Sequence, residues 1–482
     1  MTGLGLKYFV PDFISLGLLA VFLLKAILTG AKTSDVCPTK QGACSPLNTL
    51  VLGAIVLSVA LFCRSNYFGV GFGGMLTADP LAFYFKVFFT TVFFVVAFMA
   101  REFFKASSDN PGEFGLILWC PLIGLYFLAS ATHLLVLFIA LEILTMALYV
   151  MAAYSKRNPL SIEAGLKYLI MGSIASGFTI FGIALLYMKT GTLSFAEIAA
   201  AKEILLGSRL GLLALIFIFT GLGFKIATFP FQLWVPDVYQ GSPAPVGAFM
   251  GVASKAAGFL LLLRLFLITV GPLDAQWKTA FAVLSLFTLF YGNLGALAQT
   301  SMKRLMGYSS IGHAGYLMLA VAAGTLGAKA SILYYFAGYA ASTLAVFYVI
   351  TLIEKSSGSD DIENFSGLSQ TSPFLSSVLF IALLSLAGVP PLAGFMGKFW
   401  ILFAGLQAGL TWFVLAACAM VVVGFYYYLN IALKMLSRAP KTSTPLNVPV
   451  SAKIILILLS LLSLGIGLFQ ASLMRIAVTA LS

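Results

Sequence analysis

Charged residues and metal-binding side chains are scarce in this sequence. Only 9% of its 482 residues are Asp, Glu, Lys or Arg, whereas 61% are hydrophobic. A soluble globular domain carries about 25% charged residues, so the composition excludes a soluble enzyme and indicates a polytopic membrane protein. Histidine occurs twice, and the five cysteines show no CxxC spacing. We therefore expect no metal site.

The motifs of soluble enzymes are also missing. The sequence contains no P-loop and no nucleophile elbow. The run Gly69–Gly74, GVGFGG, fits the letters GxGxxG, but it lies between two apolar spans and no predicted strand precedes it. We therefore expect this chain itself to bind no NADH, no flavin and no iron–sulfur cluster.

The basic residues do not form a patch, although the formal net charge is +12. They stand singly or in pairs between apolar runs, so we expect membrane lipid as a partner and no nucleic acid.

Cys37 and Cys44 are near neighbours in the first loop, and they could form a disulfide or remain two free thiols. No cleavable signal peptide is recognisable, so the apolar run Phe9–Leu28 is predicted to stay as the first span.

Apolar runs long enough to cross a bilayer recur along the whole chain. A span needs about 20 residues, and about fourteen such runs are present. They predict an all-α protein. The approximate limits are 9–29, 47–64, 80–100, 114–130, 132–152, 165–188, 209–235, 245–270, 277–298, 305–323, 328–353, 374–407, 410–435 and 452–475.

The distribution of Lys and Arg predicts the orientation of these spans. Basic residues are concentrated in the odd-numbered loops, which should be cytoplasmic, so both termini should face the periplasmic side of a bacterial inner membrane.

The segment Ser194–Leu206 is short and amphipathic and is predicted to be an interfacial helix. The acidic segment 357–367 is predicted to be a cytoplasmic linker, with docking of a partner as the alternative.

The seventh and twelfth predicted spans contain breaks. Pro230 interrupts the seventh span after Lys225, and the segment Pro390–Gly394 interrupts the twelfth span before Lys398. Broken helices at membrane depth are tolerated only where protein or a water-filled cavity surrounds them, and they are typical of transport sites.

The spacing of ionisable residues predicts an internal duplication. Lys225 and Lys398 are 173 residues apart, and Glu142 and His313 are 171 residues apart. Spans four to eight would then correspond to spans nine to thirteen, as two inverted five-helix repeats. The position that corresponds to Lys255 falls on a tyrosine cluster. We divide the chain into an N-terminal three-span part, a first repeat, a second repeat and a last span, at residues 1–110, 111–272, 273–440 and 441–482.

Ionisable side chains inside the spans are candidates for proton transfer. Burying one costs about 2.5–3.5 kcal/mol on insertion scales, so Lys225, Lys255 and Lys398 require a reason to be there. Desolvation favours a neutral lysine and a nearby carboxylate favours the ammonium, so moving Glu142 relative to Lys225 would switch the lysine. The alternatives are snorkelling for the lysines and a structural ion pair for Glu142.

Three further residues are less certain members of a relay. His313 titrates near neutral pH and could pass protons between the lysines, or it could be a packing histidine. Lys167 lies nearer the cytoplasmic end of its span, where either a relay or snorkelling would explain it. For His133, at the start of the fifth span, a structural role is an equal alternative.

Four segments resemble the antiporter-like membrane subunits of respiratory complex I, the bacterial NADH-quinone oxidoreductase. They are SIEAGLKYLIMGSIASGF (161–178), GLGFKIATFPFQLWVPDVYQGSPAPV (221–246), QTSMKRLMGYSSIGHAGYLML (299–319) and LSLAGVPPLAGFMGKFW (384–400). Tyr239–Gly241 in the second segment and the lysine at position 398 are similar to the subunit N group rather than to its sister groups. The first loop departs from the family pattern.

The resemblance implies roles at the matching positions. Glu142 and Lys225 would form the ion pair of a first half-channel, Lys255 would be the central relay, and Lys398 would exchange protons with the far side. NADH, FMN, iron–sulfur clusters and quinone would be bound by other subunits of the complex. Sister antiporter-like subunits and small membrane subunits would be the protein partners.

The function expected from the sequence is therefore proton translocation driven by electron transfer from NADH to quinone elsewhere in the complex. Two alternatives of the transport class stay open, a subunit of a multisubunit cation/proton antiporter and a related complex with another electron donor. The non-transport alternative is a scaffold whose buried charges serve packing only.

Overall fold

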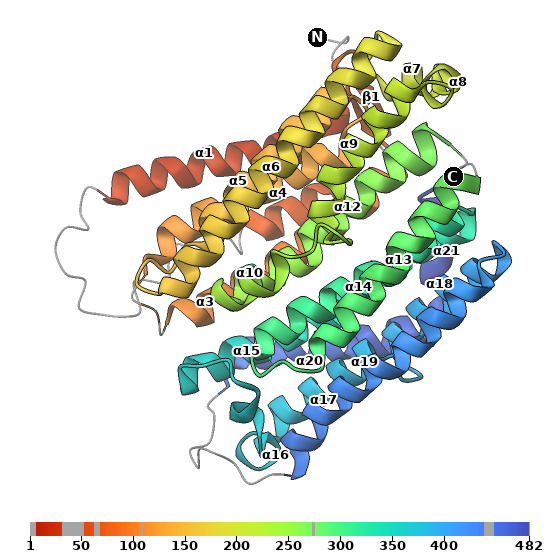
Figure 1. Ribbon diagram of the computed structural model, residues 1–482. Helices are drawn as coiled ribbons and strands as arrows, with labels where there is room; N and C mark the ends of the chain where they lie inside the picture. Colours follow the sequence, from red (N-terminus) through yellow and green to blue (C-terminus); the bar gives the residue numbers. More distant parts are fainter. Residues whose placement is uncertain are drawn as a thin grey trace. The chain divides into compact units, whose positions relative to one another are not determined.

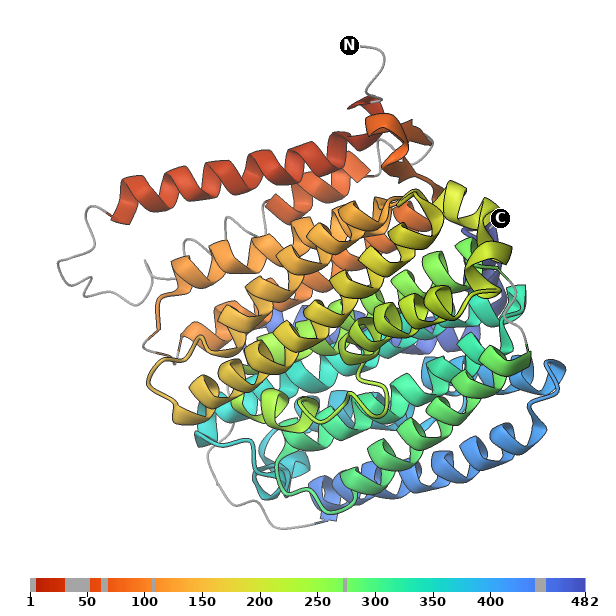
Figure 2. The same ribbon diagram turned by 45° about the horizontal axis from the view of Figure 1, so that its top comes forward.

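The computed structural model describes residues 6–30, 53–61, 68–105, 107, 109–271, 275–437 and 448–481. Cys37 and Cys44 lie outside them. The chain divides into two compact units, one of residues 1–225 with 260–271 and one of residues 226–259 with 272–482. Figures 1 and 2 show that each unit is built from long helices.

The first unit contains three long helices that begin at an Asp-Pro or Asn-Pro pair. Asp79, Asn110 and Asn158 each accept a hydrogen bond from a backbone N–H of the first turn. Proline directly after the cap supplies a helical φ and needs no N–H partner. The elements are η2 Leu6–Phe9, α1 Val10–Gly30, β1 Gly69–Gly71, η4 Phe72–Gly74, β2 Leu76–Ala78, α3 Pro80–Phe104, α4 Pro111–Ser130, α5 Leu134–Ala152, α6 Pro159–Thr190, α7 Phe195–Ala200, α8 Lys202–Leu206 and α9 Arg209–Ile226.

The second unit surrounds α15, a buried helix of 32 residues. Helices α11, α14, α17, α18, α20 and α21 all contact it. The elements are α10 Val235–Gly241, α11 Ala244–Phe249, η5 Met250–Ser254, α12 Lys255–Leu261, α13 Ala275–Ala296, α14 Met302–Ala323, α15 Leu326–Ser357, η7 Ile362–Phe365, α16 Leu368–Thr371, α17 Pro373–Ala387, α18 Ala393–Gln407, α19 Thr411–Ser437, α20 Val450–Leu468 and α21 Gln470–Thr479. Segment η5 is π-helical, and a second π-helix, η6 Leu262–Thr269, continues α12 into the first unit.

Ten helices in the described part of the chain are long and apolar enough to cross a membrane. They coincide with ten of the predicted spans. The other four predicted spans are 9–29, which is α1, 47–64, of which only residues 53–61 are described, 305–323, which is α14, and 374–407, which forms the two shorter helices α17 and α18.

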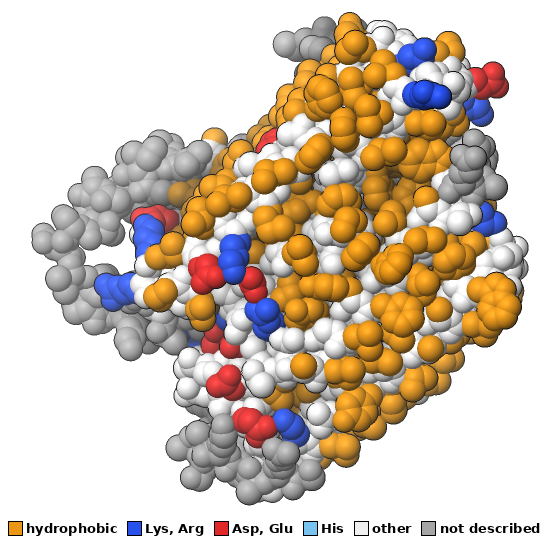
Figure 3. All heavy atoms as spheres, viewed as in Figure 1, with side chains coloured by type: hydrophobic (Ala, Val, Ile, Leu, Met, Phe, Trp, Pro, Cys, Tyr) orange, Lys and Arg blue, Asp and Glu red, His pale blue; other side chains and the backbone are white. Residues whose placement is uncertain are grey.

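Exposed faces of the helices are apolar, as a lipid-facing surface requires. On α6 the large exposed side chains recur at helical spacing; they are Leu166, Ile170, Ile174, Phe178 and Phe181. Figure 3 shows hydrophobic side chains over the exposed helix faces and charged side chains gathered near the helix ends.

Both predicted breaks are present. Helix α9 ends at Ile226 and the next helix begins at Val235. Five residues separate the end of α17 at Ala387 from the start of α18 at Ala393. The peptide bonds Phe229–Pro230 and Pro390–Pro391 are cis.

The structure adds detail to three local expectations. The GVGFGG segment forms β1 and η4 of a small hairpin, because β1 pairs with β2 in antiparallel register. The predicted single interfacial helix is two short helices, α7 and α8. The acidic linker is held in place, since Asp360 accepts hydrogen bonds at the start of α14 and Glu363 pairs with Lys434 at 2.6 Å.

Candidate functional site

Glu142 lies on α5 in the first unit, half-buried and facing α6. The hydroxyl of Ser176 on α6 donates a hydrogen bond of 2.6 Å to Glu142 Oε1. Ser176 therefore holds the Glu142 side chain in place against α6. The side chains of Tyr149 and Tyr168 lie nearby, with ring centroids 4.8 Å apart in an edge-to-face pair.

Lys225 lies in the last turn of α9, directly before the break. Its side chain is buried, and Nζ has no hydrogen-bond partner in the part of the chain that the structure describes. The carboxylate of Glu142 is within electrostatic range of the ammonium, but the two groups are not in contact. The structure therefore brings together the two residues predicted for the first half-channel, with Glu142 held by Ser176 in place of the lysine.

Lys255 is the first residue of α12, directly after the π-helix η5. It is buried, and Nζ donates a hydrogen bond of 2.6 Å to the backbone carbonyl of Ser310 on α14. The partner is a carbonyl and not a carboxylate, so the ammonium is held by a dipole alone.

His313 lies one turn farther along α14 and is also buried. Its Nδ1 is 2.5 Å from the hydroxyl of Tyr335 on α15, and its Nε2 is 3.1 Å from the hydroxyl of Tyr428 on α19. Tyr428 in turn shares a short hydrogen bond with the Ser309 hydroxyl. The predicted tyrosine cluster therefore supplies Tyr428 to the histidine, whereas Tyr426 is exposed.

Lys398 on α18 uses the break between α17 and α18. Its Nζ donates to the carbonyls of Leu386 and Ala387, at 2.8 and 2.9 Å, which are the last residues of α17. Carbonyls at a helix C-terminus lack intrahelical partners and carry partial negative charge, so they suit an ammonium. The Lys398 ammonium also lies 5.3 Å above the ring of Tyr316.

A small cavity of about 10 Å³ lies between His313 and the end of α17. It is lined by polar groups of Tyr335, Tyr339, Ser342 and Ser385. A cavity of about 10–15 Å³ holds one water molecule, so this space is at the lower limit for a water between the histidine and the carbonyls that hold Lys398.

The remaining two candidates lie in different surroundings. Lys167 on α6 forms an ion pair of 2.7 Å with Glu163, and both side chains are exposed by about half. It does not share the buried setting of the other lysines, and its relay role stays a prediction. His133 caps α5, because its Nδ1 accepts a hydrogen bond from the Leu135 N–H at 3.3 Å.

Two ion pairs in the first unit were not predicted from the sequence, one of them buried at both ends and the other with a partly exposed carboxylate. Asp12 on α1 pairs with Lys86 on α3 at 2.7 Å, and Asp79 pairs with Arg264 through two hydrogen bonds of 2.9 Å. The signal was present, since Lys86 and Arg264 both interrupt apolar runs. The partners of His313 were less accessible, because a tyrosine in a membrane span carries no charge to mark it.

Residues 131–424 match the family described as NADH:quinone oxidoreductase/Mrp antiporter, TM. The chain belongs to this family. The subunit N type of complex I proposed from the four motifs is confirmed.

Two relatives and one solved structure show how far the similarity extends. NAD(P)H-quinone oxidoreductase subunit 2 of Synechococcus sp. (strain JA-3-3Ab) is 41% identical over 393 residues, which cover 81% of this chain and 74% of the relative. NADH-quinone oxidoreductase subunit N of Methylovorus glucosotrophus is 35% identical over 438 residues, covering 89% and 90%. A chain of respiratory complex I from Thermus thermophilus, solved with bound aureothin, is 32% identical with a TM-score of 0.79, covering 96% and 98%.

The protein is therefore a multi-pass membrane subunit of respiratory complex I assemblies and takes part in proton pumping by an NADH- or NAD(P)H-quinone oxidoreductase. Antiporter-like subunits of this family carry no redox cofactor of their own. Within the described residues, no group of three or more His, Cys, Asp or Glu side chains could hold a metal ion.

Proposed function

We propose that a proton taken up from the cytoplasm near Lys225 passes to Lys255, then to His313, and leaves through Lys398. The observation that carries this proposal is the state of the three lysines. All three are buried, yet none contacts a carboxylate of the described residues. Among those residues Lys225 has no hydrogen-bond partner, and Lys255 and Lys398 donate only to backbone carbonyls.

Movement of Glu142 relative to Lys225 would provide the driving step. A carboxylate brought closer to a desolvated lysine favours the ammonium, and one moved away favours the neutral amine and release of the proton. Ser176 supports this exchange, because it holds the carboxylate while Glu142 and Lys225 are apart. Reunion of the two residues would then expel the proton toward the outer side.

We further propose the finer topology that the sequence predicts. The chain has about fourteen spans, in two inverted five-helix repeats at residues 111–272 and 273–440, with both termini on the periplasmic side of a bacterial inner membrane. Sister antiporter-like subunits and small membrane subunits flank it. Other subunits bind NADH, FMN, iron–sulfur clusters and quinone.

The test uses the whole complex reconstituted in vesicles, with NADH oxidation and proton uptake measured together. Lys225→Ala and Glu142→Ala should assemble and lower the number of protons pumped per NADH oxidised. Ser176→Ala should give a smaller loss, because it removes one hydrogen bond and no charge. Ser173→Ala is the matched control, since Ser173 is exposed on the same helix and donates only to the Leu169 carbonyl.

Unaltered pumping and electron transfer in both Lys225→Ala and Glu142→Ala would overturn the proposal. Loss of assembly with an unchanged ratio of protons to NADH in the assembled fraction would favour the scaffold alternative.

A further inference from the structure

Three buried serine hydroxyls meet beside the break between α17 and α18. The hydroxyls of Ser342 on α15 and Ser463 on α20 donate to Ser385 Oγ on α17, at 2.7 and 3.0 Å. The Gly394 N–H, in the first turn of α18, donates to the same oxygen at 3.2 Å. A hydroxyl oxygen has two lone pairs, so two of these three donors bind at a time, and Ser342 has the Gly338 carbonyl as a second acceptor at 3.2 Å. Ser385 thus links both sides of the break to two neighbouring helices.

The carbonyls at the end of α17 are divided between two kinds of donor. Backbone N–H groups directly after the helix satisfy the carbonyls of Leu384 and Ser385. The carbonyls of Leu386 and Ala387 accept from Lys398 Nζ instead. Because Lys398 lies on the other side of the break, its distance from these two carbonyls depends on how the end of α17 is held against the start of α18.

Each of the two neighbouring helices also brings a glycine against the break. On α15, Gly338 lies one turn before the serine, and a Cβ built there would be 2.8 Å from the Ala393 Cβ. On α20, Gly467 lies one turn after the serine, and a Cβ built there would be 1.9 Å from the Pro391 carbonyl oxygen. The glycine on each helix allows the close approach, and the serine on the same face makes the hydrogen bond to Ser385.

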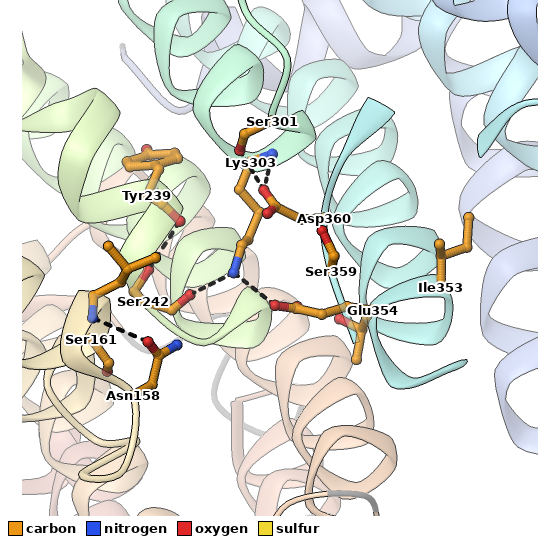
Figure 4. A network of polar contacts seen from close by, with 12 residues as sticks. Asn158, Ser161, Tyr239, Ser242, Ser301, Lys303, Ile353, Glu354, Ser359 and Asp360 are labelled. Atoms are coloured by element: carbon orange, nitrogen blue, oxygen red, sulfur yellow. Dashed lines mark hydrogen bonds and ion pairs between the residues drawn. The ribbon is translucent and has the colours of Figure 1, made fainter. Parts of the chain in front are cut away.

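Another buried lysine of the second unit is held in a different way. Lys303 donates to Glu354 Oε1 at 2.8 Å and to the Ser242 carbonyl at 3.3 Å, and Figure 4 shows its side chain reaching between the two. A carboxylate attracts an ammonium through a full charge, whereas a hydrogen bond to a carbonyl requires a short distance and a favourable angle. Lys398 contacts no carboxylate of the described residues, so it depends on the position of its two carbonyls.

We propose that the Ser342–Ser385–Ser463 cluster positions the end of α17 for proton exchange at Lys398. The cluster holds the Leu386 and Ala387 carbonyls within hydrogen-bond distance of Lys398 Nζ, on the far side of the break. The serines themselves carry no proton in this scheme. The inference rests on the proposed function, because it requires Lys398 to exchange protons.

The test uses the reconstituted complex, with protons pumped per NADH oxidised and thermal stability measured on the same preparation. Ser385→Ala should lower the ratio, because it removes the acceptor that all three donors share. Ser463→Ala should lower it less, since two donors remain, and Ser342→Ala with Ser463→Ala should approach the loss in Ser385→Ala. Ser463→Thr retains the hydroxyl and should recover most of the parental ratio.

Ser331→Ala is the matched control for these variants. Ser331 is also buried on α15, but its hydroxyl donates to the Ala328 carbonyl of its own helix. Its replacement should lower the thermal stability about as much as Ser342→Ala does and leave the ratio unchanged. A loss of stability alone is thereby separated from a loss of positioning.

Gly467→Ala tests the same inference without removing a hydroxyl. The added methyl group would displace the segment between α17 and α18, so the ratio should fall. Gly465→Ala on the same helix should match the parent, because a Cβ there meets nothing within 4 Å.

Lys398→Gln separates this inference from the proposed function. Normal pumping by Lys398→Gln would overturn the role of Lys398 in the proposed function, and the positioning role with it. A loss in Lys398→Gln with normal pumping by Ser385→Ala and Gly467→Ala would overturn the positioning role alone.

Two further results would also count against the serine cluster. One is a Ser463→Thr complex that pumps no better than Ser463→Ala, and the other is an equal loss of pumping in Ser331→Ala. Either result would show that the losses follow from altered packing and not from the hydrogen bonds to Ser385.

Discussion

The buried lysines are held in a way that leaves their charge free to change. A carboxylate partner would stabilise an ammonium strongly, because its full charge acts at short range in a medium of low dielectric constant. The carbonyls that hold Lys255 and Lys398 offer only a dipole, and they also accept a hydrogen bond from a neutral amine. Proton loss from these lysines therefore costs less than it would from an ion pair.

His133 caps α5 directly before the span Leu134–Ala152, and it provides a pH-dependent prediction. Burial lowers the pKa of its imidazole below the ordinary value of 6.5, although the Glu197 charge acts in the opposite direction. A histidine whose pKa is lower in the folded state binds protons more readily when unfolded, so the start of α5 should be fully stable above pH 6.5 and lose stability as the pH falls below it.

Hydrogen exchange of the first turn of α5, corrected for the intrinsic rate, should therefore be faster at about pH 5.5 than at about pH 7.5, since the imidazole titrates in that range. His133→Asn retains an acceptor for the helix cap but does not titrate, and it should lose this pH dependence. Equal protection of the parent at both pH values would contradict the prediction.

At the scale of elements, close helix contacts fix the position of His313. Gly292 on α13 faces Gly312 on α14, and a Cβ built on Gly292 would lie 2.2 Å from the Gly312 backbone nitrogen. Gly315 on α14 similarly faces the backbone of Leu289. His313 lies between the two glycines of α14, so the spacing of this helix pair sets where its imidazole lies.

Gly292→Ala should therefore separate α13 from α14 and weaken the contacts of His313. Overpacking typically costs about 1–3 kcal/mol, so we expect a lower thermal stability together with fewer protons per NADH. Gly177→Ala on α6 is the control, because a Cβ there meets nothing within 4 Å and should change neither quantity. A Gly292→Ala complex with parental stability and pumping would show that the close contact between α13 and α14 does not determine the position of His313.

At the scale of the whole chain, one ion pair joins distant parts of the first unit. Arg264, on the π-helix η6, binds Asp79 at the start of α3 and also donates to the Ala129 carbonyl at 2.7 Å. The contact joins the start of α3 and the end of α4 to the part of the eighth predicted span that belongs to this unit.

Arg264→Gln should destabilise the subunit by about 1–3 kcal/mol, because Asp79 would keep its charge and lose its partner while remaining partly exposed. Asp79→Asn retains the cap of α3, so the double variant Asp79→Asn with Arg264→Gln should recover part of the loss. Thermal unfolding of the purified complex measures both. Additive losses in the double variant would contradict a direct interaction.

The sequence was sufficient to predict the features that follow from the length of apolar runs, from proline, and from the free-energy cost of burying a charge. Apolar runs located ten helices that are long enough to cross a membrane, prolines located both breaks, and the cost of burying a charge singled out Lys225, Lys255 and Lys398. It was not sufficient for their partners. The groups that hold Lys255 and Lys398 are backbone carbonyls, which every residue carries, and only the packing of α12 on α14 and of α17 on α18 selects them. Arg264 and Lys86 could have been found by the same cost argument.

The π-helix η5 determines where Lys255 points. A π turn accommodates an extra residue relative to an α-helix, and each residue of an α-helix turns the chain by about 100°. The direction of the Lys255 side chain is thus fixed by how many residues precede it in Met250–Ser254, more than by which residues they are. Deleting one residue there would leave the span almost as apolar and as long as before, but it would rotate Lys255 by about 100° away from α14.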